Sequence, residues 1–257
     1  MYLPFNLLKM QPLIMQTLVM LTAWSAIVAT SPASAEQRPD TLRLAVIDDV
    51  PSTHMAYELV RAAYDQLGIT VETVVVPSRR ALALADAGGV DGDLFRIKGM
   101  ADQYANLVQV PYPLLQGRLL AVVRDDSDIQ TIETSSRPLT VAIRRGVIIA
   151  ERAAKSEGMS PQFARNYRQI RQMLDWGRVD VGLVSDIEGH SPLNNPEWDH
   201  LRALPVPVAH FTLFHYVHRR HEHLVKPLAE ALEKLHNDGE KRKIFETALH
   251  RERASRK

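Results

Sequence analysis

Residues 77–97 contain both of the hydrophobic patterns that recur along this chain. Apolar residues first fall at helical spacing beside arginines, and Gly88 and Gly89 end the pattern, which predicts a short amphipathic helix. From 90 to 97, apolar residues interleave with charged ones, which predicts a strand that ends in charge at Arg96. Because an unpaired charge is costly to bury, a charged strand end predicts a place where something binds.

This stretch completes a series of three predicted strands that alternate with two helices. The predicted strands cover 42–47, 71–76 and 90–97, and the first helix covers 53–67 and ends at Gly68. Parallel strands need a crossover connection, so this order predicts parallel pairing with right-handed crossovers.

A strand is predicted at 119–123, and a second series of the same kind follows it. Its strands are predicted at 139–143, 162–167 and 179–184, its helices at 147–157 and 168–176, and a turn at 144–146. Residues 191–199 are rich in Pro and Asn and predict a loop, residues 206–217 predict one or two further strands, and Leu224 opens a leucine stripe that predicts a helical tail.

The two series predict an α/β fold with two lobes. Each lobe is expected to be a mostly parallel sheet flanked by helices, with a cleft between the lobes. Open parallel sheets bind ligands at the carboxyl ends of their strands. Two such lobes that face each other are expected to trap a ligand by hinge closure.

The first 35 residues differ from the rest of the chain. They hold one charged residue, Lys9, then an apolar run over 12–30 and an A-x-A site that ends at Ala35. This order predicts a signal peptide over 1–35, cleaved after Ala35, and hence a periplasmic protein. The alternative is a retained anchor helix, for which the run is of marginal length.

Composition excludes several function classes. The 31 basic residues nearly equal the 30 acidic ones, and removal of Lys9 makes them equal, which argues against nucleic acid as a partner. The chain has no cysteine, so neither a disulfide framework nor a thiol nucleophile is available. No cofactor is predicted.

Several short motifs in a fixed order resemble those of a known family. They are P-x-x-R-A-L at Pro77 to Leu82, the run Gly88 to Arg96, Tyr112-Pro113, Arg145-Gly146, R-x-H-x-x-L at Arg219 to Leu224, and Asp238-Gly239. In these features the chain resembles the type II periplasmic solute-binding proteins, specifically the amino-acid-type solute-binding family 3.

The resemblance implies a discontinuous first lobe, with the second lobe inserted between two crossover strands. The implied limits are 36–120 and 207–257 for the first lobe and 121–206 for the second. It also implies a monomer that delivers a small polar, carboxylate-bearing solute to an inner-membrane ABC permease. Amino-acid binders of this family commonly hold the α-carboxylate with an arginine after the third strand, yet residues 101–104 here contain none. The solute is therefore left open.

In the first lobe, four positions are candidates for ligand binding. Arg96 has a planar fork that suits a carboxylate, and the alternative is a structural salt bridge to Asp91 or Asp93. The other three candidates are Arg80 at a helix start, Asp48 or Asp49 after the first strand, and Tyr112 as a stacking residue.

In the second lobe, Arg145, Gly146 and Val147 precede a predicted helix, so their backbone N–H groups are expected to bind an anion. Ser185 or Asp186 follows a buried strand and would face the cleft, although loop polarity explains them almost as well.

Two other interpretations start from the same residues. An enzyme on this scaffold, similar to the dehydratases known among the relatives, would need an acid or base such as Asp49, Asp93 or His54. A sensor domain would act by docking to a membrane receptor. The histidines between 215 and 223 raise the question of a metal site. Side chains that alternate along a strand and continue into a helix point in different directions, so no metal site is predicted.

Overall fold

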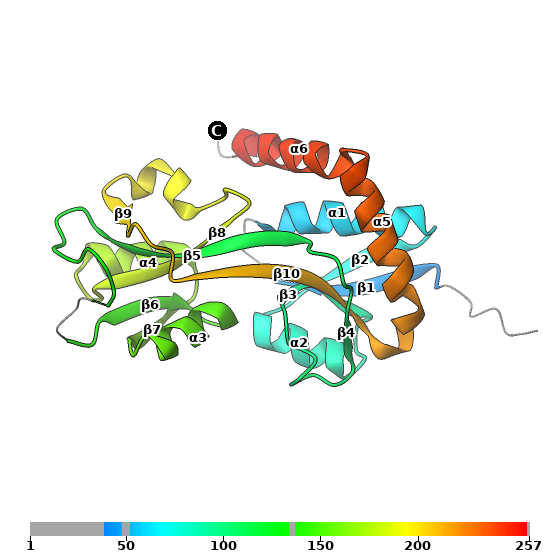
Figure 1. Ribbon diagram of the computed structural model, residues 1–257, viewed down its shortest axis with the longest axis horizontal. Coiled ribbons are helices and arrows are strands. Elements are labelled where there is room, and N and C mark those ends of the chain that lie inside the picture. Colours follow the sequence, from blue (N-terminus) through cyan, green and yellow to red (C-terminus); the bar gives the residue numbers. More distant parts are fainter. Residues whose placement is uncertain (1–38, 48–51, 134–136, 256–257) are drawn as a thin grey trace, which may run out of the picture. The chain divides into compact units, whose positions relative to one another are not determined.

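The computed structural model describes residues 39–47, 52–133 and 137–255 (Figure 1). The predicted signal peptide lies outside these residues. Within the described parts, no helix is both long enough and apolar enough to cross a membrane.

The first predicted series is confirmed. Its elements are β1 (Thr41–Val46), α1 (Ser52–Gln66), β2 (Thr70–Val75), α2 (Ser78–Asp86) and β3 (Gly92–Ile97). Strand β1 pairs in parallel with both β2 and β3, as the crossover argument predicts. Gly68 and Gly88 follow the two helices with φ of 72° and 73°, a conformation that side chains with a Cβ rarely adopt.

The predicted strand before the second series is β5 (Leu115–Arg124), and the second series is also present. Its elements are β6 (Thr140–Arg144), α3 (Ile148–Ser156), β7 (Ser160–Ala164), α4 (Tyr167–Asp175) and β8 (Val181–Ile187). Strand β6 pairs in parallel with β7 and β8. The predicted loop at 191–199 contains two short 3-10 helices, η1 (Pro192–Asn194) and η2 (Pro196–Trp198).

The tail returns through β10 (Ala209–His218), η3 (Arg219–Leu224), α5 (Val225–Asn237) and α6 (Glu240–Ser255). Two three-residue strands, β4 (Leu107–Gln109) and β9 (Leu201–Ala203), were not predicted, because they are too short to show a period.

The long strands β5 and β10 join the two parallel halves of the sheet. The strand order is β2-β1-β3-β10-β5-β8-β6-β7, and β10 is antiparallel to both β3 and β5. These two strands lie side by side in the middle of Figure 1. The outer strands of each half are therefore parallel, as predicted, while the connection between the halves is antiparallel.

Each half of the sheet has its own hydrophobic core. We call first lobe the part whose core is built on β1, α1, α2, β3 and α5, and second lobe the part built on β6, α3, α4 and β8. Leu115 packs in a first-lobe core and Leu119 in a second-lobe core, so β5 passes between the lobes within this short stretch. This crossing lies a few residues before the boundary between 120 and 121 that the sequence analysis gives. The lobe limits themselves stay a prediction.

A fully buried Tyr–His pair links α1 to β10 in the first lobe. The Nδ1–H group of His215 donates to the carbonyl of Leu94 at 3.1 Å, which leaves Nε2 to accept from the Tyr64 hydroxyl at 2.9 Å. Burial lowers the pKa of His215 to about 4. The neutral imidazole is thus the form that the folded chain accommodates.

We predict that His215 makes the protein less stable in acid. The unfolded chain takes up this proton near its ordinary pKa of 6.5, whereas the folded chain does so near 4, so stability is lost as the pH falls between these values. Denaturant unfolding at pH 7 and pH 4.5 should show a larger loss in the parent than in His215→Gln, by about 2 kcal/mol. An equal loss in both proteins would contradict the assignment.

Candidate functional site

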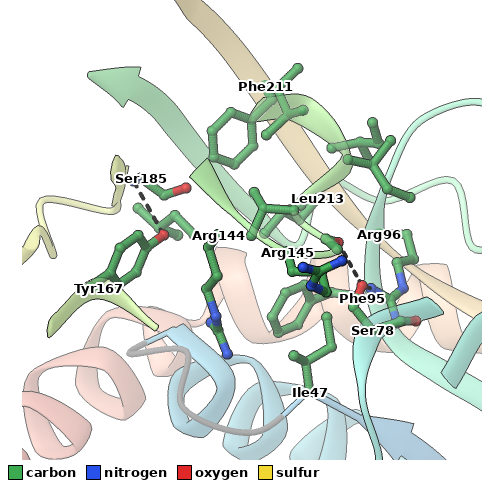
Figure 2. Close-up of a pocket in the computed structure, with 16 residues that line it drawn as sticks. Ile47, Ser78, Phe95, Arg96, Arg144, Arg145, Tyr167, Ser185, Phe211 and Leu213 are labelled. Atoms are coloured by element: carbon green, nitrogen blue, oxygen red, sulfur yellow. Dashed lines mark hydrogen bonds between the residues drawn. The ribbon is translucent and has the colours of Figure 1, made fainter. Parts of the chain in front are cut away.

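A pocket lies where the carboxyl ends of strands from both lobes meet. It encloses about 80 Å³. Figure 2 shows Ile47 after β1, Arg96 in β3, Arg144 at the end of β6 and Ser185 in β8 around it. Open α/β sheets bind ligands at this edge of their strands. Of the predicted site residues, Arg96, Arg145, Gly146, Val147 and Ser185 line this pocket.

Arg96 is held by the protein itself. Its Nε and Nη2 atoms donate to Oδ2 of Asp93 at 2.9 and 2.6 Å, and its Nη1 donates to Oγ of Ser78 at 2.8 Å. Arg96 is 4% exposed and Asp93 is 1% exposed. Burial raises the pKa of Asp93, and the guanidinium opposes that rise. The structural salt bridge, one of the two interpretations of Arg96, is therefore present, and ligand contact by Arg96 stays a prediction.

Ser78 connects this ion pair to the second lobe. Its hydroxyl accepts from Arg96 and donates to the carbonyl of Gly146 at 2.7 Å. Gly146 has a φ of 81°, and a Cβ placed on it would lie 2.8 Å from Cβ of Ser78. Close approach of the two lobes at this point therefore requires glycine. On the exposed side of the same contact, Arg79 pairs with Glu151 of α3.

The amides predicted to bind an anion are engaged inside the protein. The N–H group of Arg145 donates to Ala164, that of Gly146 to the Glu151 carboxylate, and that of Val147 to Arg144. This corrects the prediction, which could not anticipate that Glu151 turns back onto Gly146. The available donors lie one step further along the chain. Ile148 and Ile149 are the first two residues of α3 and line the pocket, and amides at these positions have no acceptor within a helix.

Arg144, which the sequence analysis did not single out, is the buried arginine of this turn. It is 8% exposed, lines the pocket and places its guanidinium 5.9 Å from the centre of the Tyr167 ring. The side chain of Arg145 is exposed, and its guanidinium lies 4.9 Å from the centre of the Phe163 ring on β7. The available signal was the register of β6, in which Arg144 directly follows the apolar run and ends the buried strand.

The side chains of Ser185 and Asp186 lie on opposite faces of β8, as those of neighbouring residues on a strand do. Ser185 is 7% exposed, its backbone N–H donates to the Tyr167 hydroxyl at 3.3 Å, and its own hydroxyl makes no hydrogen bond to any described residue. Asp186 does not line the pocket and pairs with Arg118 of β5. Ser185 is therefore the residue of this pair that faces the cleft.

The other predicted site residues do not come together at the pocket. Tyr112 packs against the first-lobe core, with Lys241 of α6 5.5 Å from the centre of its ring, and Arg80 is exposed on α2. Neither residue lines the pocket, so the structure does not bring them together with Arg96, and their contact with a ligand stays a prediction. Asp48 and Asp49 lie outside the described residues. Among the described residues, no group of three or more His, Asp or Glu side chains is arranged to hold a metal ion.

Comparison with known proteins places the fold. No family model matches the chain. An uncharacterized protein of Shewanella oneidensis is 27% identical over 245 residues, which cover 91% of this chain and 90% of that protein. One similar structure is the substrate-binding protein of an amino acid ABC transporter, with a TM-score of 0.66 and 18% identity over 80% of this chain and 98% of that one. Another is a histidine kinase sensor domain with similarity to periplasmic binding proteins, with a TM-score of 0.67 and 19% identity over 82% of this chain and 97% of that one.

The chain has the periplasmic-binding-protein fold. An ancestral amino-acid-binding protein, described as a precursor of cyclohexadienyl dehydratase, is also similar, with a TM-score of 0.66 and 18% identity over 81% of this chain and 95% of that one. The periplasmic-binding-protein fold that the motifs predict is thus confirmed.

We predict that Gly146→Ala destabilises the contact between the lobes. Both Gly146 and Gly158 have positive φ, but a Cβ on Gly158 would meet no atom within 4 Å. Gly158→Ala therefore measures backbone strain alone, on the order of 1 kcal/mol. Denaturant unfolding should show that Gly146→Ala loses at least about 1 kcal/mol more than this control. Equal losses would mean that Ser78 yields to the added methyl group without cost.

We also predict that Arg96 is needed for folding stability. Arg96→Gln leaves the buried Asp93 carboxylate without its cation, and breaking a buried pair in this way costs about 3–5 kcal/mol. The exposed Arg80→Gln is the control and should change stability by less than about 0.5 kcal/mol. The double variant Asp93→Asn with Arg96→Gln should lose less than Arg96→Gln alone in denaturant unfolding. A loss in Arg96→Gln as small as in Arg80→Gln would contradict this role.

Proposed function

We propose that the protein is a periplasmic solute-binding protein that captures a small, carboxylate-bearing solute between its two lobes. One observation carries the proposal: three kinds of group that can bind an anion belong to second-lobe residues that line one pocket. These are the Arg144 guanidinium, the Ser185 hydroxyl and the first amides of α3. Guanidinium groups and helix N-termini both favour carboxylates.

The burial of these groups makes an anion a favourable ligand. Arg144 and Ser185 are each more than nine-tenths buried, so their interactions with a ligand are weakly screened by water. The hydroxyl of Ser185 has no partner among the described residues and can donate to a carboxylate without breaking a bond within them. The cavity of about 80 Å³ is smaller than the roughly 150 Å³ that holds benzene, which favours a small solute or one that parts the lobes on entry.

We propose binding without catalysis, and delivery of the solute to an inner-membrane ABC permease by a monomer. Support comes from the similarity to the substrate-binding protein of an amino acid ABC transporter. The similar histidine kinase sensor domain supports a second candidate, in which the loaded protein docks to a membrane receptor. Both candidates require the same solute-binding step, and the apolar stretch before Ala35 supports export in either case.

We predict that Arg144, and not Arg145, sets the affinity for the solute. The test is a thermal-shift screen of the exported, purified protein against keto acids, amino acids, polyamines and dicarboxylates, followed by titration calorimetry of the hits. A ligand at 100 times its Kd adds about 2.7 kcal/mol of stability, which gives a readable shift. Arg144→Gln should raise the Kd of a carboxylate hit at least tenfold, because a charge-assisted hydrogen bond contributes about 1.5–3 kcal/mol.

Arg145→Gln is the matched control, since it removes the same charge from the next residue, and its Kd should stay within about threefold of the parent. Melting of each variant without ligand separates a loss of affinity from a loss of folding. An equal effect of both substitutions, or hits confined to polyamines, would overturn the assignment of an anion site at Arg144.

A further inference from the structure

Strand β5 carries a glycine where it passes from one lobe to the other. Leu115 packs in a first-lobe core and Leu119 in a second-lobe core, and Gly117 lies between them on the same face, because alternate residues of a strand share a face. Gly117 pairs with Phe211 of β10 on one side and with Ile187 of β8 on the other. The face of the sheet between the two cores therefore lacks a side chain at its centre.

The ring of Phe211 fills the space that Gly117 leaves. A Cβ placed on Gly117 would lie 2.5 Å from Cζ and 2.6 Å from Cε2 of this ring, closer than real Cβ contacts. Directly opposite residues of an antiparallel pair have their side chains on the same face of the sheet. Phe211 also packs against a core of each lobe, and it lines the pocket. The ring thus covers Gly117 and presents its own surface to the pocket at the crossing of the lobes.

The residues around this ring form an apolar wall on the first-lobe side of the pocket. Strands β3, β8 and β10 supply this first-lobe wall: Phe95, Ile97, Ile187, Phe211 and Leu213. In the view of Figure 2, Leu213 lies between Phe211 and Phe95. Burial of hydrocarbon against such a surface strengthens binding by roughly fourfold for each methylene group. The cavity of about 80 Å³ is small, so the space left by one aromatic ring decides how much hydrocarbon fits.

We infer that Phe211 is the specificity-determining residue that sets the size of the apolar part of the solute. The inference rests on the proposed function and deepens it: the second lobe holds the carboxylate, and the hydrocarbon part of the solute extends to the Phe211 ring. Gly117 is a positioning residue, because the absence of a side chain lets the ring lie against β5. A smaller residue at 211 leaves room for a longer solute, and a side chain at 117 leaves less.

A methyl group on Gly117 displaces the ring rather than the backbone. The carbonyl oxygen of Asp186 lies 3.1 Å from the same Cβ position, and the pairing of β8 with β5 holds this backbone in place. The Phe211 ring is the end of a rotatable side chain, so it yields first to overpacking. Because the ring lies over Gly117 and lines the pocket, it moves toward the space that the solute would occupy.

Titration calorimetry with the exported, purified protein tests the inference on three homologous series. They are straight-chain monocarboxylates, 2-oxo acids and α-amino acids, each lengthened by one methylene group at a time from the three-carbon to the eight-carbon acid. In at least one series we expect the Kd of the parent protein to fall by roughly fourfold for each methylene group up to a limiting length, and to rise beyond it. A Kd that falls through to the longest acid of every series that binds would overturn the inference.

Phe211→Leu should move this limit to longer acids. The first acid beyond the parent's limit should bind the variant at least tenfold more tightly than it binds the parent. Phe163→Leu is the matched control, because it removes the same ring from an exposed residue of β7 that does not line the pocket, and it should leave the limit unchanged. The same limit in Phe211→Leu as in the parent overturns the inference and leaves the proposed function standing.

Gly117→Ala should move the limit the other way and weaken the longest accepted acid at least tenfold. Gly182→Ala is its control: the added Cβ would lie 2.7 Å from Cγ2 of Ile170, and neither of these residues lines the pocket. The double variant Gly117→Ala with Phe211→Leu should regain most of the lost affinity, because the methyl group no longer meets a ring. A loss that persists undiminished in the double variant argues against the positioning role of Gly117.

The remaining outcomes separate this inference from the proposed function. Melting of each variant without ligand distinguishes a loss of affinity from a loss of folding. Phe211→Leu and Gly117→Ala should shift the limit in opposite directions, so either variant that folds tests the inference, and the limiting length of the parent tests it without any variant. Absence of binding across all three series, with a folded parent protein, overturns the proposed carboxylate site as well.

Discussion

The hydroxyl group of Ser78 is the point on which the arrangement of the site depends. It accepts a hydrogen bond from Arg96 in the first lobe and donates one to the carbonyl of Gly146 in the second. The ion pair with Asp93 positions Arg96 for its hydrogen bond. Gly146 can approach Ser78 because it has no Cβ and its backbone has a positive φ. Once Gly146 is fixed against Ser78, the start of α3 has a defined position at the pocket.

The two buried arginines at the pocket, Arg96 and Arg144, differ in how the protein engages them. Arg96 donates four hydrogen bonds to Asp93 and Ser78, so its charge is largely neutralised and it supports the first-lobe wall. Arg144 ends β6 immediately before the fixed turn, and its position over the Tyr167 ring directs it to the same pocket as Ser185. Tyr167 in turn accepts the Ser185 amide hydrogen, so three residues of the second lobe hold one another in place. The wall of the first lobe and the anion site of the second are thus built from separate sets of contacts.

Much of the fold could be predicted from the sequence because its units are local. Strand–helix–strand order is visible in hydrophobic periods, and parallel pairing follows from the crossover connections. The antiparallel pairing of β10 with β5 and β3 was not predicted, because it joins residues about a hundred positions apart through backbone groups that leave no sequence pattern. The three-residue strands β4 and β9 were missed for the opposite reason, since they are too short to have a period.

The residues that line the pocket were predicted in part, and the missed or misplaced ones have a common cause. The rule that strand ends face the cleft found Arg96 and Ser185, whose position depends only on strand register. It did not separate neighbouring residues: Arg144, which lines the pocket, was not singled out beside Arg145, and Asp186, which does not line it, was kept beside Ser185. It also failed where a side chain from elsewhere intervenes, as Glu151 does at the amide of Gly146. Such contacts are fixed by tertiary packing, which the local pattern does not record.

The fold by itself leaves the function open. A transporter's substrate-binding protein, a kinase sensor domain and an ancestor of a dehydratase resemble this chain with TM-scores of 0.66 to 0.67. Because the same scaffold serves binding, signalling and a lineage that led to catalysis, the distinction must lie in the side chains at the pocket. Here those side chains are a guanidinium, a hydroxyl with no partner among the described residues, and an apolar wall. That combination suits the recognition of an anion.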